Sequence, residues 1–85
     1  MNNPEIKIIG EKVRKARIIA NLTLKELSKK TGIGYATLAR IEEGKRIINV
    51  VELMKIGSIT NKPLTYFLQE GNNVIEYYYP PAYRH

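Results

Sequence analysis

The chain has 85 residues, with 14 Lys and Arg against 8 acidic residues and a formal net charge of +6. It contains no Cys, no Asp and no Trp, and its one His is the last residue, His85. A hydrolytic triad needs a nucleophile, a base and an orienting group, and a zinc site needs several Cys, His or carboxylate ligands. The composition therefore argues against an enzyme, and we expect no metal site and no other cofactor.

Length and hydropathy also limit the architecture and the compartment. A chain this short makes one small domain, which must be stabilised by helix packing or dimerisation because no disulfide is possible. No apolar run reaches the roughly 18 residues of a membrane span, and the first residues do not resemble a signal peptide. We therefore expect a cytoplasmic protein that is not attached to a membrane.

The first periodic segment predicts a helix from about Ile8 to Ala20. Ile9, Val13, Ala16 and Ala20 recur at the spacing that places them on one helix face, which we expect to be buried. Asn21 is a plausible end of this helix, because Asn tolerates the left-handed backbone conformation.

Two short helices joined by a glycine turn are predicted next. Thr23, followed three residues later by Glu26, is a capping box that starts the first of them. Gly32 ends that helix, because glycine adopts positive φ without strain. The second is predicted over Tyr35–Glu43, with two buried apolar residues, and Gly44 closes it; the buried pair is Leu38 and Ile41.

Two further helices complete a predicted all-α, five-helix domain. The fourth runs from about Val50 to Ser58 after the N-cap Asn49, and its expected buried stripe contains Val50, Leu53, Met54 and Gly57. Pro63 suits the first turn of a fifth helix, which contains Leu64, Phe67 and Leu68.

The end of the chain has a different composition. Val74–Tyr79 is β-prone, and Pro80-Pro81 then prevents a regular element. We divide the chain into a domain over 1–70 and an extended, tyrosine-rich tail over 71–85. The tail can pair with a second copy, dock a partner protein through residues 74–83, or stay disordered.

The positive charge is concentrated in the first half. Residues 7–46 contain eleven Lys and Arg against four Glu, a net charge of +7, whereas residues 47–85 are neutral. An asymmetric basic half is typical of a protein that binds a polyanion, although a basic charge can also serve solubility alone.

The two short helices have the helix-turn-helix arrangement, in which the second helix enters the DNA major groove. Here the chain resembles the XRE family of phage Cro and repressor proteins over about residues 9–70. The matching stretches are Ile9–Arg14, Leu22-Thr23, Glu26-Leu27, Gly32-Ile33, Thr37-Leu38, Arg40–Glu42, Gly44-Lys45, Leu53 and Lys55-Ile56.

The resemblance implies roles for the helix 35–43. Its first two residues and its sixth would face the bases, with two neighbours beside them; these residues are Tyr35, Ala36, Arg40, Thr37 and Ala39. Arg40 can bond bidentately to guanine, and Ala36 can contact a thymine methyl group.

Phosphate contacts are implied at two other places. They would come from the start of the first motif helix and from the loop after the second, and the candidates are Thr23, Lys25, Gly44, Lys45 and Arg46. In the family, an Arg of the first helix often pairs with a Glu that ends the recognition helix. That resemblance implies a structural pair between Arg17 and Glu42.

The chain departs from the family pattern at several positions. Leu24 replaces a Gln that contacts phosphate, and Gly34 replaces a Ser or Thr helix cap. Thr31 stands where an apolar residue is usual. Thr60 and Lys62 replace an apolar pair, so that Ile59 is expected to supply the packing instead.

The sequence therefore predicts a regulator of transcription that binds double-stranded DNA, as a dimeric repressor on a palindromic operator. Its half-sites would lie about 34 Å apart. The alternative is a protein-interaction module of the same fold, antitoxin-like or an adaptor, that does not read DNA. An Arg40→Ala variant separates the two hypotheses.

Overall fold

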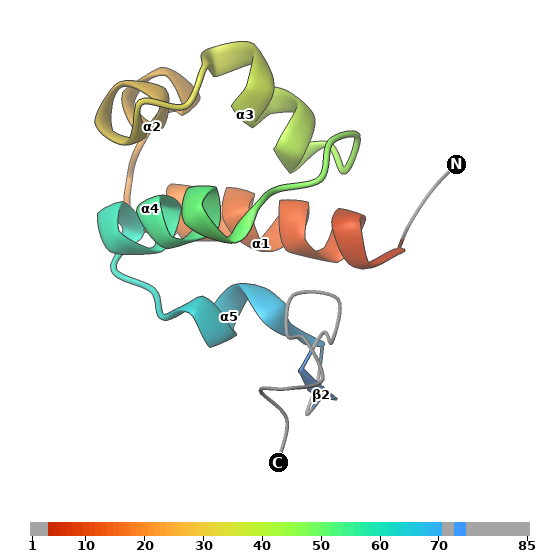
Figure 1. Ribbon diagram of the computed structural model, residues 1–85. Helices are drawn as coiled ribbons and strands as arrows, with labels where there is room; N and C mark the ends of the chain where they lie inside the picture. Colours follow the sequence, from red (N-terminus) through yellow and green to blue (C-terminus); the bar gives the residue numbers. More distant parts are fainter. Residues whose placement is uncertain (1–3, 71–72, 75–85) are drawn as a thin grey trace.

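The computed structural model describes residues 4–70 and 73–74, and five helices make up most of this part of the chain (Figure 1). They are α1 (Pro4–Ile19), α2 (Leu24–Thr31), α3 (Tyr35–Glu42), α4 (Val50–Thr60) and α5 (Leu64–Leu68). Two short strands, β1 (Gln69–Glu70) and β2 (Asn73–Val74), pair antiparallel after α5. The all-α fold is confirmed, while most of the predicted β-prone segment and of the tail lies outside the described residues.

The first helix begins earlier than predicted. It starts at Pro4, which suits a first helical turn because the ring fixes φ and the missing N–H needs no partner there. The prediction started at Ile8 because it followed only the apolar spacing. The end agrees with the prediction: Asn21 has a φ of 61°, and Ile9, Val13 and Ala16 are buried.

The predicted caps of the short helices are present. The Thr23 hydroxyl accepts a bond from the Glu26 N–H at 3.0 Å, and the Glu26 carboxylate accepts one from the Thr23 N–H at 2.8 Å. These bonds lower the pKa of Glu26, because they stabilise its ionised form. Gly32 ends α2 at a φ of 76°, and Gly44 follows α3 at a φ of 74°. Local sequence therefore determines where α2 begins and where both helices end.

One core surrounds α1, which crosses the middle of the molecule between the α2–α3 pair and α5, as Figure 1 shows. Each helix contributes fully buried side chains, and the core consists of Ile9, Val13, Ala16, Leu27, Ile33, Leu38, Ile41, Ile48, Leu53, Ile56, Phe67 and Leu68. Burial of this apolar surface is the main stabilising contribution in a domain without disulfides.

The predicted buried stripe of α4 is partly wrong. Val50 and Met54 are exposed, whereas Ile56 and Thr60 join Leu53 and Gly57 in the interior. A Cβ on Gly57 would collide with the Lys62 carbonyl of the turn after α4 and lie 3.4 Å from the Phe67 ring of α5, so both pack closely against this glycine.

Thr60 itself takes the place of the expected apolar residue. Its side chain is buried, and its hydroxyl donates to the Ile56 carbonyl at 2.7 Å. A Thr whose hydroxyl is bonded within its own helix leaves only its methyl group for packing. Ile59 does not supply this packing, because 36% of it is exposed.

Candidate nucleic-acid interface

The angle between α2 and α3 is fixed by side chains in the turn between them. The Thr31 hydroxyl donates to the Leu27 carbonyl at 2.7 Å and accepts a bond from the Ile33 N–H at 3.2 Å. The Ser28 hydroxyl donates to the Ile33 carbonyl, and the Ile33 side chain enters the core. Thr31 therefore replaces an apolar residue without leaving a buried hydroxyl unpaired. The turn is rigid, and it sets how far α3 projects from the body.

The helix α3 has a buried face and a free face. Leu38 and Ile41 are buried, whereas Tyr35, Ala36 and Arg40 are exposed. Thr37 and Ala39 lie at the margin and are half-buried. Three of the five predicted base-contact residues therefore lie on the exposed face of α3, and the other two lie at its margin. At its start, Gly34 makes no side-chain cap, in agreement with its lack of a hydroxyl.

Arg17 and Glu42 form a bidentate pair between α1 and the end of α3. Arg17 Nε lies 2.7 Å from Glu42 Oε2, and Arg17 Nη2 lies 3.0 Å from Oε1. Arg17 Nη1 also donates to the Leu22 carbonyl at 3.0 Å. Only 15% of the Arg17 side chain and 7% of the Glu42 side chain are exposed. The hydrogen bond to Glu42 raises the pKa of Arg17, and neither side chain of the pair faces outward.

A second contact between α1 and α3 was missed in the sequence. A Cβ on Gly10 would collide with the Ile41 carbonyl oxygen and lie 3.2 Å from that of Glu42. Gly10 is itself buried in the middle of α1. A glycine inside a helix costs stability relative to Ala, so its presence at this position was the available signal. It allows α1 and α3 to approach closely where the Arg17–Glu42 pair also joins them.

The residues predicted to contact phosphate differ in their exposure and in their contacts within the protein. Thr23 and Lys25 are exposed at the start of α2. Gly44 packs against the α1 backbone, where a Cβ would lie 2.9 Å from the Cα of Lys7. Lys45 is exposed, and its Nζ lies 3.6 Å from Glu43 Oε1, a distance at which a surface pair contributes little.

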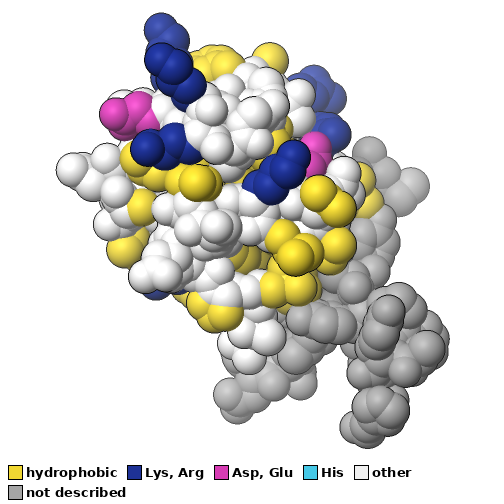
Figure 2. Space-filling model, turned by 60° about the vertical axis from the view of Figure 1, so that its left-hand side comes forward, with side chains coloured by type: hydrophobic (Ala, Val, Ile, Leu, Met, Phe, Trp, Pro, Cys, Tyr) yellow, Lys and Arg dark blue, Asp and Glu magenta, His cyan; other side chains and the backbone are white. Residues whose placement is uncertain are grey.

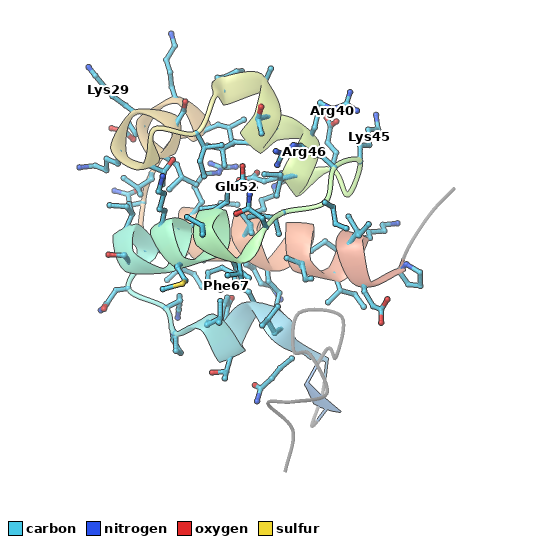
Figure 3. The ribbon with its side chains drawn as sticks, viewed as in Figure 1. Lys29, Arg40, Lys45, Arg46, Glu52 and Phe67 are labelled. Carbon is cyan, nitrogen blue, oxygen red and sulfur yellow. The ribbon has the colours of Figure 1, made fainter. Side chains whose placement is uncertain are left out.

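Arg46 is bonded to other residues of this chain. Its guanidinium donates to both carboxylate oxygens of Glu52, at 3.1 and 3.3 Å, and to the Ile47 carbonyl at 3.1 Å. Figure 3 shows Arg46 between the end of α3 and α4, on the side of Glu52, whereas Arg40 and Lys45 point away from the body. Sequence reasoning assigned Arg46 to phosphate and gave Glu52 no role.

On the face that Figure 2 shows, most Lys and Arg side chains lie in the upper part of the molecule. Hydrophobic side chains lie between them and in larger patches below them. Lys29 and Lys30 of α2 are exposed. Among the described residues, no cluster of acidic or His side chains could hold a metal ion.

Comparisons with known proteins agree with this geometry. A family model described as helix-turn-helix matches residues 13–67, a segment that includes α2, the turn and α3. The chain belongs to this helix-turn-helix family. The resemblance to XRE-type Cro and repressor proteins is thereby confirmed for the family, and the family supports a DNA-binding regulator of transcription. No curated protein matches the chain in sequence.

A solved structure shares the fold. The restriction-modification controller protein C.AhdI from Aeromonas hydrophila is similar with a TM-score of 0.72 and a sequence identity of 17%. The alignment covers 76% of this helix-turn-helix chain and 98% of the controller protein. At this identity the similarity is one of fold. None of the described helices is long and apolar enough to cross a bilayer.

Proposed function

We propose that this protein is a sequence-specific regulator that binds duplex DNA with α3 in the major groove. The observation that carries the proposal is the free outer face of α3, with Tyr35, Ala36 and Arg40 exposed on a helix whose other face is locked into the core. The major groove, about 12 Å wide, admits one α-helix. The net charge of +7 over residues 7–46 supplies the attraction to phosphate.

Each exposed residue of α3 has a role that its chemistry supports. Arg40 donates two parallel bonds to guanine O6 and N7, while the Ala36 methyl contacts a thymine methyl group. Tyr35 and Thr37 donate their hydroxyls to a base or a phosphate, and Ala39 lies beside them. Contacts to the DNA phosphates come from Thr23 and Lys25 at the start of α2 and from Lys45 after α3, and they fix the register without reading sequence. Gly44 does not fit the predicted phosphate contact, because its N–H already donates to the Ile41 carbonyl at 3.0 Å.

We further propose that the protein acts as a cytoplasmic homodimer that represses transcription by occupying a palindromic operator. The exposed apolar side chains of α4 support dimerisation, since Val50, Val51 and Met54 form a surface that water does not favour. This surface continues into an open groove between α4 and α5, of about 670 Å³, which includes Met54, Pro63 and Leu64. Two copies related by a twofold axis present their recognition helices about one DNA turn apart.

Selection from a random duplex pool tests this function directly. The proposal expects enrichment of a symmetric site whose halves are centred about 10 base pairs apart, or a multiple of that spacing. Enrichment of an asymmetric single site would contradict dimeric reading but keep α3 as the reader. No enrichment at low salt would contradict DNA reading.

The same exposed surface of α4 favours a second candidate function. A module that uses Val50, Val51 and Met54 to bind another protein would share the fold and leave the face of α3 unused. It would behave as an antitoxin-like partner or an adaptor. Arg40→Ala separates the two, because it weakens a DNA reader and leaves binding through α4 unchanged.

A further inference from the structure

The loop between α3 and α4 contains two adjacent basic residues that the structure uses differently. The Lys45 side chain is 67% exposed, and its closest acid, Glu43, lies 3.6 Å away and is itself 56% exposed. The Arg46 side chain is 37% exposed and makes three hydrogen bonds, two to Glu52 and one to the Ile47 carbonyl. Proximity in sequence therefore does not give these two cations the same access to DNA.

Glu52, the partner of Arg46, is also held by hydrogen bonds at the start of α4. Glu52 Oε1 accepts the Asn49 N–H at 3.0 Å, and the Asn49 side chain accepts the Glu52 N–H at 2.7 Å. This capping box starts α4 and orients the carboxylate toward the loop. Only 16% of the Glu52 side chain is exposed. Arg46 therefore binds a carboxylate whose position is already determined by the helix.

We propose that Arg46 and Glu52 form a closed charge pair, the loop clasp, which orients the α3–α4 loop beside the recognition helix and withholds Arg46 from DNA phosphates. This inference rests on the proposed function and refines its contact surface. Arg46 and Glu52 are positioning residues, and the cation of this loop that binds phosphate is Lys45. Figure 3 shows the arrangement, with Arg46 directed toward Glu52 and Lys45 directed outward.

The clasp has a consequence for the salt dependence of DNA binding. Each phosphate that a cation neutralises contributes about −0.9 to the slope of log affinity against log salt. A cation already neutralised by a carboxylate releases no counterion when DNA binds, so the clasp contributes nothing to the slope. Lys45 contributes one full increment.

The test compares salt slopes for one duplex, using the full chain and three variants. The charge-neutral double variant Arg46→Gln/Glu52→Gln removes the clasp and keeps the cap, because Gln also serves at that position of a capping box. Lys45→Gln is the matched control, one residue away in the same loop. Glu52→Gln alone releases Arg46 while preserving its charge. Thermal unfolding followed by circular dichroism verifies that each variant is folded.

The loop clasp predicts three results. The double variant keeps the wild-type slope, whereas Lys45→Gln makes the slope shallower by about 0.9. Glu52→Gln makes the slope steeper by about 0.9, so that its affinity falls about 3.5-fold more than the wild-type affinity between 50 and 200 mM salt.

Two outcomes separate failure of the clasp from failure of the proposed function. A double variant whose slope falls as much as that of Lys45→Gln would show that Arg46 binds phosphate, and the clasp would be wrong while DNA binding stands. A wild-type chain that binds no duplex at low salt would contradict the proposed function and the withholding of Arg46 together. If the double variant does not fold, Glu52→Gln decides: an unchanged slope overturns the clasp.

Discussion

Two Arg–Glu pairs lie near the C-terminal end of α3, and they differ in their surroundings. The inner joint consists of Arg17–Glu42 and of the close approach of Gly10 to the Ile41 carbonyl, and it lies between α1 and α3. The loop clasp, Arg46–Glu52, joins the α3–α4 loop to the start of α4. Side-chain exposure is 15% and 7% in the first pair but 37% and 16% in the second.

The difference shows that the same pair of residue types serves two purposes. A buried charge without a partner destabilises the folded state. We therefore expect the packing of α3 against α1 to require both members of the Arg17–Glu42 pair. Charges near the surface are screened, so the loop clasp contributes little to stability and instead determines which cations remain available to a ligand. The predictions below test this contrast, beginning with the largest effect.

Loss of one partner at the inner joint should have the largest effect. We expect Arg17→Met to lower the free energy of unfolding by about 3 kcal/mol, because Glu42 is then left charged and largely buried. Urea unfolding at neutral pH measures this loss. The double variant Arg17→Met/Glu42→Leu should be more stable than Arg17→Met, since no isolated charge remains. A loss of less than 1 kcal/mol in the single variant would place this pair in the same class as a surface pair.

The second-largest loss of stability is expected when the contact between α1 and α3 at the inner joint is overpacked. Gly10→Ala is expected to cost about 2 kcal/mol of stability, because its Cβ collides with a backbone carbonyl that cannot rotate away. Gly34→Ser is the matched control, since a Cβ there lies 3.6 Å from its nearest neighbour, Thr37 Oγ1. A serine at this N-cap should raise stability by a few tenths of a kcal/mol. Equal effects at the two glycines would contradict the close α1–α3 contact.

Loss of the loop clasp should have a smaller effect on stability. We expect Arg46→Gln to lower the free energy of unfolding by no more than about 1 kcal/mol, because the Arg46 side chain is 37% exposed and its charge is screened by water. The measurement is the same urea titration as for Arg17→Met. A loss equal to that of Arg17→Met would show that the two joints are energetically alike, and the contrast between them would be wrong.

The smallest expected effect is the contribution of the loop clasp to the pH dependence of stability. Burial opposes ionisation of Glu52, but hydrogen bonds from Arg46 and Asn49 and the charges of Arg46 and Lys55 outweigh it and lower the pKa of Glu52. Its folded pKa thus lies below its unfolded value, so the stabilisation is present above the unfolded value, near 4.3, and is lost as the pH falls through the folded pKa. Urea unfolding between about pH 6 and pH 3 should show this loss. A Glu52→Gln variant with the same pH profile as the wild type would contradict it.

The elements that depend on local sequence could be predicted. The Thr23–Glu26 box, the N-cap Asn49 and the glycines after α2 and α3 act over a few residues, so their spacing was sufficient. The pairing of Arg17 with Glu42 came from family resemblance, since the two residues are 25 positions apart and no local pattern joins them. The base-contact residues of α3 came from the same resemblance, whereas its buried residues, Leu38 and Ile41, followed from their apolar spacing.

The remaining features depend on how helices meet. Val50 and Met54 satisfy the spacing of a buried stripe, yet Ile56 and Thr60 are buried in the structure and Val50 and Met54 are exposed. Arg46 looked like a free cation because its partner, Glu52, lies in the next helix and is oriented by a cap. Such contacts are set by tertiary geometry, which periodicity along a single helix does not contain.

The central claim is that the outer face of α3 reads duplex DNA, and Arg40→Ala tests it most directly. The affinities of the wild type and the variant are measured at one low salt concentration, on the selected duplex and on an unrelated duplex. The account predicts that the variant loses about 5- to 150-fold on the selected duplex, the equivalent of one bidentate guanine contact. It should lose much less on the unrelated duplex. Unchanged affinity of Arg40→Ala for the selected duplex would contradict the account.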